Sequence, residues 1–199
     1  MAWIYRGNVN LPQADRDNNA WEIYNFFHSQ GWAVESIAAM AGNIDVESTV
    51  NPQRVNANSG ARGLTQWLGN RRTMMIDYVT NTLGYSSWDN GDGQIRYILH
   101  EEQAPSSTEG WLKRGGYDRT FSQFATNSEN DSLQDLAYMW QMCYERVSIG
   151  VPVPVRYRRT QYYYQLFRGG PGPGPGNVPK WLLYAGRRKQ KRVNCTIHI

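Results

Sequence analysis

Apolar residues recur at spacings of three and four through most of the chain, which is the period of an α-helix. In a first segment these residues share one helical face: Ala20, Ile23, Tyr24 and Phe27. Asp17 or Asn18 can cap the start of this helix, and Gly31 can end it. The pattern therefore predicts a helix from about residue 17 to residue 30.

A second helix is predicted from Ala33 to Ser48, with one apolar face: Val34, Ile37, Ala38, Ala41 and Ile44. Further helical segments are expected at 70–84, 93–104, 131–147 and 156–167. No run alternates apolar and polar residues as a half-buried strand would. The pattern predicts a mainly α domain, with room for one or two short hairpins between Asn56 and Trp67.

Alternating Gly and Pro in 169–179 mark the one clear boundary, because such a sequence holds neither a helix nor a strand ladder. The expected organisation is a domain at 1–168 with an N-terminal arm at 1–16, then this linker, then a basic tail at 180–199. All 17 acidic residues precede the tail, whereas six of the 21 Lys and Arg lie in it. The positive net charge of +4 therefore belongs to the tail. The tail is expected to be solvated and to order on a partner, or to dock on an anionic surface or on another subunit of an assembly.

Several function classes lack support in the sequence. No stretch approaches the roughly 20 apolar residues of a membrane span, and the first residues do not resemble a secretory signal. Cys143 and Cys195 form no disulfide framework, and His28, His100 and His198 are scattered without a metal-binding motif. We expect no metal or organic cofactor, and no Cys143 nucleophile paired with His100.

The stretch "GNIDVESTVNP" carries an acid, Glu47, to the end of the second predicted helix. Glu47 follows Ile44 by three positions, at the margin of the apolar face, and Asn51-Pro52 closes the helix soon after. Partial burial at such a place raises the pKa of a carboxyl group and keeps it protonated as a proton donor. An ordinary surface glutamate is the alternative on periodicity alone.

The next segment, "SGARGLTQW", turns on Gly60 and Gly63 and then presents Gln66 and Trp67. Glycines let the backbone turn tightly and let a ligand approach. An amide beside an aromatic plate suits sugar hydroxyls and N-acetyl groups. The combination with Glu47 is what a saccharide site requires.

An acid followed by Ser, Asn-Pro and Gly-Ala-x-Gly-Leu-x-Gln resembles the catalytic signature of lysozyme-like muramidases and lytic transglycosylases. With the segments "GQIRYILHEE" and "LAYMWQMCYER", the chain resembles the phage tail lysozyme family over about 18–167. This resemblance implies a two-lobed, mostly helical fold with a central cleft. It also implies a virion enzyme that cleaves the β-1,4 bond between N-acetylmuramic acid and N-acetylglucosamine in bacterial peptidoglycan during genome entry.

By position, the resemblance makes Glu47 the general acid. Ser48 would fix the turn, Gln66 would line the cleft, and Trp67 would pack or stack on a sugar. Tyr144, in the last resembling segment, joins the expected substrate-binding group.

Glycoside hydrolysis usually needs a second carboxylate. Asp45 lies about 200° around the helix from Glu47 and is discounted. Glu101 and Glu145 fall in resembling segments and are the candidates. Glu145 can instead pair with Arg146, and Glu101 can be an exposed helix end. A lytic transglycosylase, which uses one acid for both proton transfers, stays open as well.

Two other classes compete with a tail enzyme. Arginines and tyrosines interleave in 146–168, as in nucleic-acid surfaces, but a core-facing aromatic helix explains them better and no nucleic-acid partner is expected. A lysis endolysin would use the same chemistry. A non-catalytic, wall-binding virion protein would need no Glu47 motif, and that motif is present.

Overall fold

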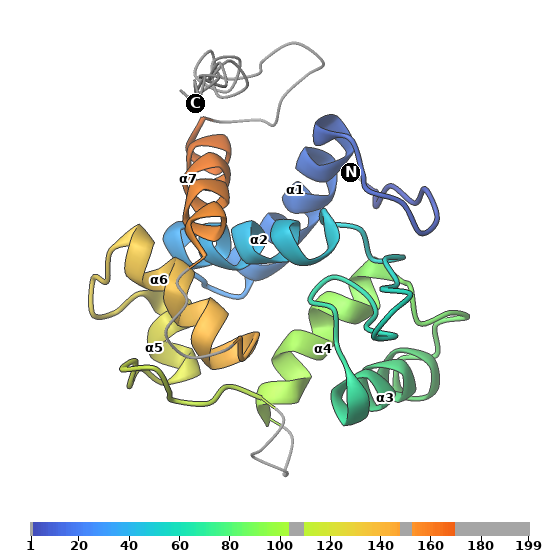
Figure 1. The fold of residues 1–199 in the computed structure, drawn as a ribbon. Coiled ribbons are helices and arrows are strands. Elements are labelled where there is room, and N and C mark those ends of the chain that lie inside the picture. Colours follow the sequence, from blue (N-terminus) through green and yellow to red (C-terminus); the bar gives the residue numbers. More distant parts are fainter. Residues whose placement is uncertain (1, 104–109, 148–152, 170–199) are drawn as a thin grey trace, which may run out of the picture.

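The structure, a computed structural model, describes residues 2–103, 110–147 and 153–169, and in these residues it is built from helices joined by loops (Figure 1). In chain order the helices are α1 (Gln13–Ser29), α2 (Val34–Ser48), α3 (Gly69–Asp77), the π-helical η1 (Tyr78–Thr82), α4 (Gly91–Gln103), α5 (Phe121–Thr126), α6 (Leu133–Met139), the π-helical η2 (Trp140–Tyr144) and α7 (Pro154–Arg168). The predicted mainly α fold is confirmed. The tail and all of the linker after Gly169 lie outside the described residues.

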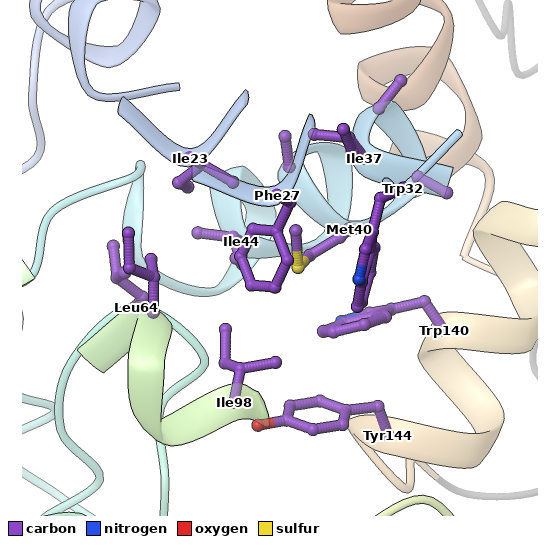
Figure 2. Close-up of a cluster of buried hydrophobic side chains, with 14 of the residues drawn as sticks. Ile23, Phe27, Trp32, Ile37, Met40, Ile44, Leu64, Ile98, Trp140 and Tyr144 are labelled. Atoms are coloured by element: carbon purple, nitrogen blue, oxygen red, sulfur yellow. The ribbon is translucent and has the colours of Figure 1, made fainter. Parts of the chain in front are cut away.

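Helix α2 lies at the centre of the domain, with α5 and α6 on one side and α3 and α4 on the other (Figure 1). Its residues Ile37, Met40 and Ile44 are fully buried, and polar residues of the same helix are buried with them. Figure 2 shows side chains from α1, α4 and η2 converging on them. A helix covered on nearly all sides is a core helix, so the single apolar face predicted for this segment understates its burial.

Helices α2 and α7 pack closely, and Gly42 allows the approach. A Cβ atom added to Gly42 would lie 2.4 Å from the backbone nitrogen of Thr160 and 2.7 Å from its Oγ1. Because the nearest atom is backbone, no side-chain rotation could relieve that clash. Gly42 is therefore needed to bring the first half of α7 against the second half of α2.

Helix α1 begins at Gln13, four residues before the predicted Asp17 cap. Pro12 supplies a fixed φ of −65° at the N-cap position, and Asp17 lies inside the helix, buried. There Asp17 accepts hydrogen bonds from the Gln13 side-chain nitrogen and from the Tyr162 hydroxyl, both at 2.8 Å. Asp17 therefore contacts α7 in place of capping α1, and local sequence rules do not reveal a tertiary contact of this kind.

The predicted hairpin region contains isolated antiparallel bridges, Val55 with Arg62 and Arg62 with Trp67, and no strand forms among the described residues. Helix α5 was not predicted, because its six residues are too few to show a period. Its start is nevertheless readable, since Thr120 and Gln123 form a capping box.

Candidate functional site

Glu47 lies in the last turn of α2, and 23% of its side chain is exposed. Its Oε1 atom accepts a hydrogen bond from Nη2 of Arg156, which comes from the first turn of α7. Ser48 is buried, and its hydroxyl donates to the Ile44 carbonyl at 3.1 Å. The side chain of Glu47 is therefore partly buried and held by an ion pair, while Ser48 supports the helix end from inside.

The backbone just after Glu47 is in an unusual conformation. Thr49 and Val50 both have positive φ, 58° and 55°. For a β-branched residue this costs on the order of 1–3 kcal/mol and requires support from the surroundings. The support comes from the N-terminal segments: Leu11 N–H donates to Thr49 Oγ1 at 3.0 Å and Asn19 Nδ2 donates to the Val50 carbonyl at 3.0 Å. Strain of this kind concentrates at functional sites.

Asp45 and Glu47 have different partners. Asp45 is buried and forms ion pairs with Arg16 and Arg159, both at 3.0 Å, and accepts from the Tyr163 hydroxyl at 3.2 Å. These contacts tie α2 to α1 and α7. The role of Asp45 is structural.

The loop after α2 is held by Gln94 of α4, which is fully buried. Its Nε2 donates to the Pro52 carbonyl at 2.9 Å, and its Oε1 accepts from Leu64 N–H at 2.9 Å. Gln66 is half-buried at a φ of 53°, and its Nε2 donates to the Gly63 carbonyl at 2.9 Å. The Oε1 atom of Gln66 accepts no hydrogen bond from the described residues, which leaves an acceptor for another group.

Glu101 is buried in an ion pair with Arg71, whose Nε and Nη2 donate to its two oxygens at 2.6 and 2.8 Å. The Tyr144 hydroxyl donates to Glu101 at 2.7 Å, and the indole nitrogen of Trp67 lies 3.4 Å from the same oxygen. The alternative of an exposed helix end at Glu101 is therefore wrong, because three side chains, those of Arg71, Tyr144 and Trp67, enclose this carboxylate.

Two expected substrate-binding residues are buried. Trp67 is 1% exposed and meets the Tyr97 ring edge-on, so of its two expected roles, packing and stacking on a sugar, the structure shows packing. Tyr144 is equally buried, with its ring stacked on Trp140 at 4.3 Å. Both side chains contact the carboxylate of Glu101.

Glu145 follows η2 and is half-buried. Its Oε1 accepts from the indole nitrogen of Trp140 at 3.0 Å. Burial, and after it the negative charge of Glu47, raises the pKa of Glu145 to about 8, although Arg156 and Arg71 act in the opposite direction. Near neutral pH, Glu145 therefore carries a proton.

The alternative of a Glu145–Arg146 ion pair is not what the structure shows. Arg146 Nη2 donates to the Gly110 carbonyl at 2.6 Å, and the backbone of Arg146 is at a φ of 61°. The ion pairs of the described residues do not include Glu145. Because it has no ion-pair partner among the described residues, Glu145 differs from both other candidate acids.

Acidic and basic groups thus alternate around one region of the molecule. Glu101 pairs with Arg71, Arg71 acts electrostatically on Glu145, and Glu145 interacts with both Glu47 and Arg156. Glu47 is thus close enough to Glu145 to act on its pKa. Glu101 is fully buried and paired with Arg71.

Sequence reasoning missed the two arginines, Arg71 and Arg156. Both come from segments predicted as helices, and neither carries a local motif. Arg156 is 4% exposed, and an arginine that deeply buried needs an acidic or polar partner. The sequence indicates these arginines only indirectly. A buried acid needs a basic or polar partner, but the sequence does not identify which residue that partner is.

Other site types find no support in the described residues. No group of three or more His, Cys, Asp and Glu lies close enough together to hold a metal ion there. No helix in that part of the chain has the length and apolarity needed to cross a bilayer.

Comparison with known proteins assigns the class. The model of the family described as phage tail lysozyme matches residues 18–167, which is most of the chain and includes α2 through α7. The chain belongs to the phage tail lysozyme family, and its helical fold and Glu47 motif agree with that membership.

A curated relative is similar over a longer stretch. Morphogenesis protein 1 of Bacillus phage B103 is 26% identical over an alignment of 179 residues that covers 83% of this chain and 44% of the relative. The chain therefore spans less than half the length of that phage protein.

Proposed function

We propose that this protein is a peptidoglycan glycosidase of a phage virion, which cleaves the β-1,4 bond between N-acetylmuramic acid and N-acetylglucosamine during genome entry. The observation that supports it most is that Glu47, in the last turn of α2, acts electrostatically on Glu145 and helps to raise the pKa of that carboxyl group. Two interacting carboxylates of which one holds a proton near neutral pH are what acid catalysis of glycoside cleavage needs. Membership of the phage tail lysozyme family agrees with this chemistry.

In this proposal Glu47 transfers the proton, because it occupies the acid position of the family motif and its side chain is 23% exposed. The proton goes to the glycosidic oxygen as its bond to the sugar C1 breaks, and water supplies the hydroxyl that C1 gains. Glu145, whose pKa is raised, is proposed as the partner carboxyl group. Gln66, with its open amide oxygen, is proposed to bind an N–H or O–H group of the glycan.

A lytic transglycosylase would use the same acid, but the 6-hydroxyl of muramic acid would attack C1 in place of water. Mass spectrometry of fragments released from purified walls separates these outcomes. A reducing N-acetylmuramic acid end supports hydrolysis, whereas a 1,6-anhydro end supports the transglycosylase. Fragments cut only in the peptide stems would contradict both.

A structural role in the virion is the second candidate. The name of the relative, Morphogenesis protein 1, favours it for that protein. The two roles are separable, because a purely structural protein would bind walls without releasing any glycan fragment.

A further inference from the structure

Arg156 is a buried cation that reaches two side chains of α2. Its Nη1 donates to Asn43 Oδ1 at 2.9 Å, and its Nη2 donates to Glu47 Oε1. Asn43 and Glu47 are four residues apart, so they lie on the same face of the helix, one turn from each other. The guanidinium group therefore spans one turn of α2 and ends on the proposed acid.

The far end of this bridge is fixed. Asn43 is fully buried, and its Nδ2 donates to the carbonyls of Ala39 at 2.9 Å and Ala137 at 3.0 Å. With both amide hydrogens used, its oxygen has one orientation, toward Arg156. The planar, five-donor fork of arginine then transmits that orientation to Glu47, which a flexible lysine would not do.

The close packing of α7 on α2 allows Arg156 to reach Asn43 and Glu47. Gly42, next to Asn43, lets α7 pack on α2 at Thr160, one helical turn from Arg156. Arg159, on the same helix, ion-pairs with Asp45 instead. Helix α7 thus delivers two arginines to two acids of α2, and only Arg156 reaches the acid of the site.

The charge of Arg156 also acts on the second carboxylate. Glu47 raises the pKa of Glu145, whereas Arg156 lowers it, and Arg71 lowers it from the side of α3. Tyr144, from η2, is a further titratable group that interacts with Glu145, and its hydroxyl donates to Glu101 of α4. The guanidinium therefore offsets part of the repulsion between the two acids.

We propose that Arg156 is a positioning residue for glycan cleavage: it holds Glu47 in one orientation on a frame anchored at Asn43 and supplies the positive charge between the two carboxylates. This inference rests on the proposed function. It adds a residue outside the Glu47 motif, on a helix whose sequence carries no catalytic signature.

The test compares Arg156→Gln, Arg156→Lys and a matched control, Arg159→Gln, which removes an α7–α2 ion pair without touching Glu47. Initial rates of wall clearing are measured against wall concentration and pH. Arg156→Gln is expected to lower the saturating rate on the order of 10–100-fold, with a small change in the half-saturating wall concentration. Its alkaline limb should move to higher pH, because Glu145 loses a nearby cation. Arg156→Lys keeps the positive charge but not the planar donor group. Its pH profile should therefore be nearer to the native one than its saturating rate is.

Arg159→Gln is expected to lower the unfolding temperature while keeping the saturating rate and the pH profile of the folded fraction. If Arg156→Gln is too unstable to purify, Arg156→Lys provides the test. It is expected to lower the saturating rate without changing the half-saturating wall concentration. A folded Arg156 variant with the native rate and pH profile would overturn the inference. Glu47→Gln, measured in parallel, keeps the cases apart: full activity there contradicts the proposed function itself, whereas its loss beside a native Arg156→Gln contradicts only the role of Arg156.

Discussion

Glu101 and Glu145 are separated by their surroundings, although both come from helical segments that resemble the same family. Glu101 is enclosed by Arg71, Tyr144 and Trp67, and Arg71 forms an ion pair with it. Glu145 receives one indole hydrogen bond and faces a second acid. At the residue scale, the partner of a carboxylate decides whether it serves stability or chemistry.

Replacing Glu101 by Gln keeps the shape and removes the charge, which leaves Arg71 buried without a counter-ion. Breaking a buried ion pair in this way is expected to lower the free energy of unfolding by about 3–5 kcal/mol. Urea unfolding measures the loss. Wall-clearing activity per folded molecule should change much less, so a native stability with abolished activity would assign Glu101 to catalysis instead.

Glu145 is expected to make stability fall with rising pH. Because its folded pKa of about 8 lies above the ordinary value of 4.5, the folded protein binds this proton more tightly than the unfolded chain does. The contribution is complete below about pH 4.5 and is lost as the pH rises through about 8. Glu145→Gln should therefore lose less stability between pH 5 and pH 8.5 than the native chain, by on the order of 1–3 kcal/mol.

Thermal unfolding of both proteins across that pH range measures the difference. Parallel pH profiles for the native chain and Glu145→Gln would show that this carboxyl group titrates normally.

At the scale of elements, the crossing of α2 and α7 determines the site. Gly42→Ala would place a methyl group 2.4 Å from the Thr160 backbone, so α7 has to move away. The expected cost is about 1–3 kcal/mol, together with reduced activity because Arg156 moves with the helix. Gly169→Ala, where the nearest atom is 3.3 Å away at the end of α7, is the control and should change the unfolding temperature little. Equal stability of the two variants would contradict the close crossing.

The elements also show how far the sequence could be interpreted. The predicted helix from Ala33 to Ser48 matches α2 closely because three- and four-residue spacing and the closing Asn-Pro are local signals. Glu47, at its end, could be proposed for the same reason, and Asp45 could be discounted from helical geometry alone. Helix α5 was missed because six residues carry no period, and its capping box was the one available sign.

The contacts that separate the acids could not be predicted. Arg156 lies 109 residues from Glu47 in sequence, and Arg71 lies 30 residues from Glu101. Pairing of this kind follows from helix packing, not from any neighbouring motif. The same reason explains Trp67, whose position after a glycine turn suggested a sugar plate but whose indole the fold buries under α4.

At the scale of the whole molecule, the domain and the basic tail have opposite charge. The chain carries a net charge of +4, yet its acids all lie before the tail. The family model covers the helical domain and stops at residue 167. We therefore assign the proposed glycan cleavage to the domain, and we propose that the tail contacts other virion proteins.

The central claim is that glycan cleavage depends on the carboxyl proton delivered by Glu47. The most direct test is the initial rate of turbidity loss of purified bacterial walls with the native chain and with Glu47→Gln, which keeps the side-chain shape and removes the titratable proton. Circular dichroism verifies that both are folded. The account predicts clearing by the native chain and a loss of at least about 100-fold in the variant. Equal clearing by both proteins would contradict it.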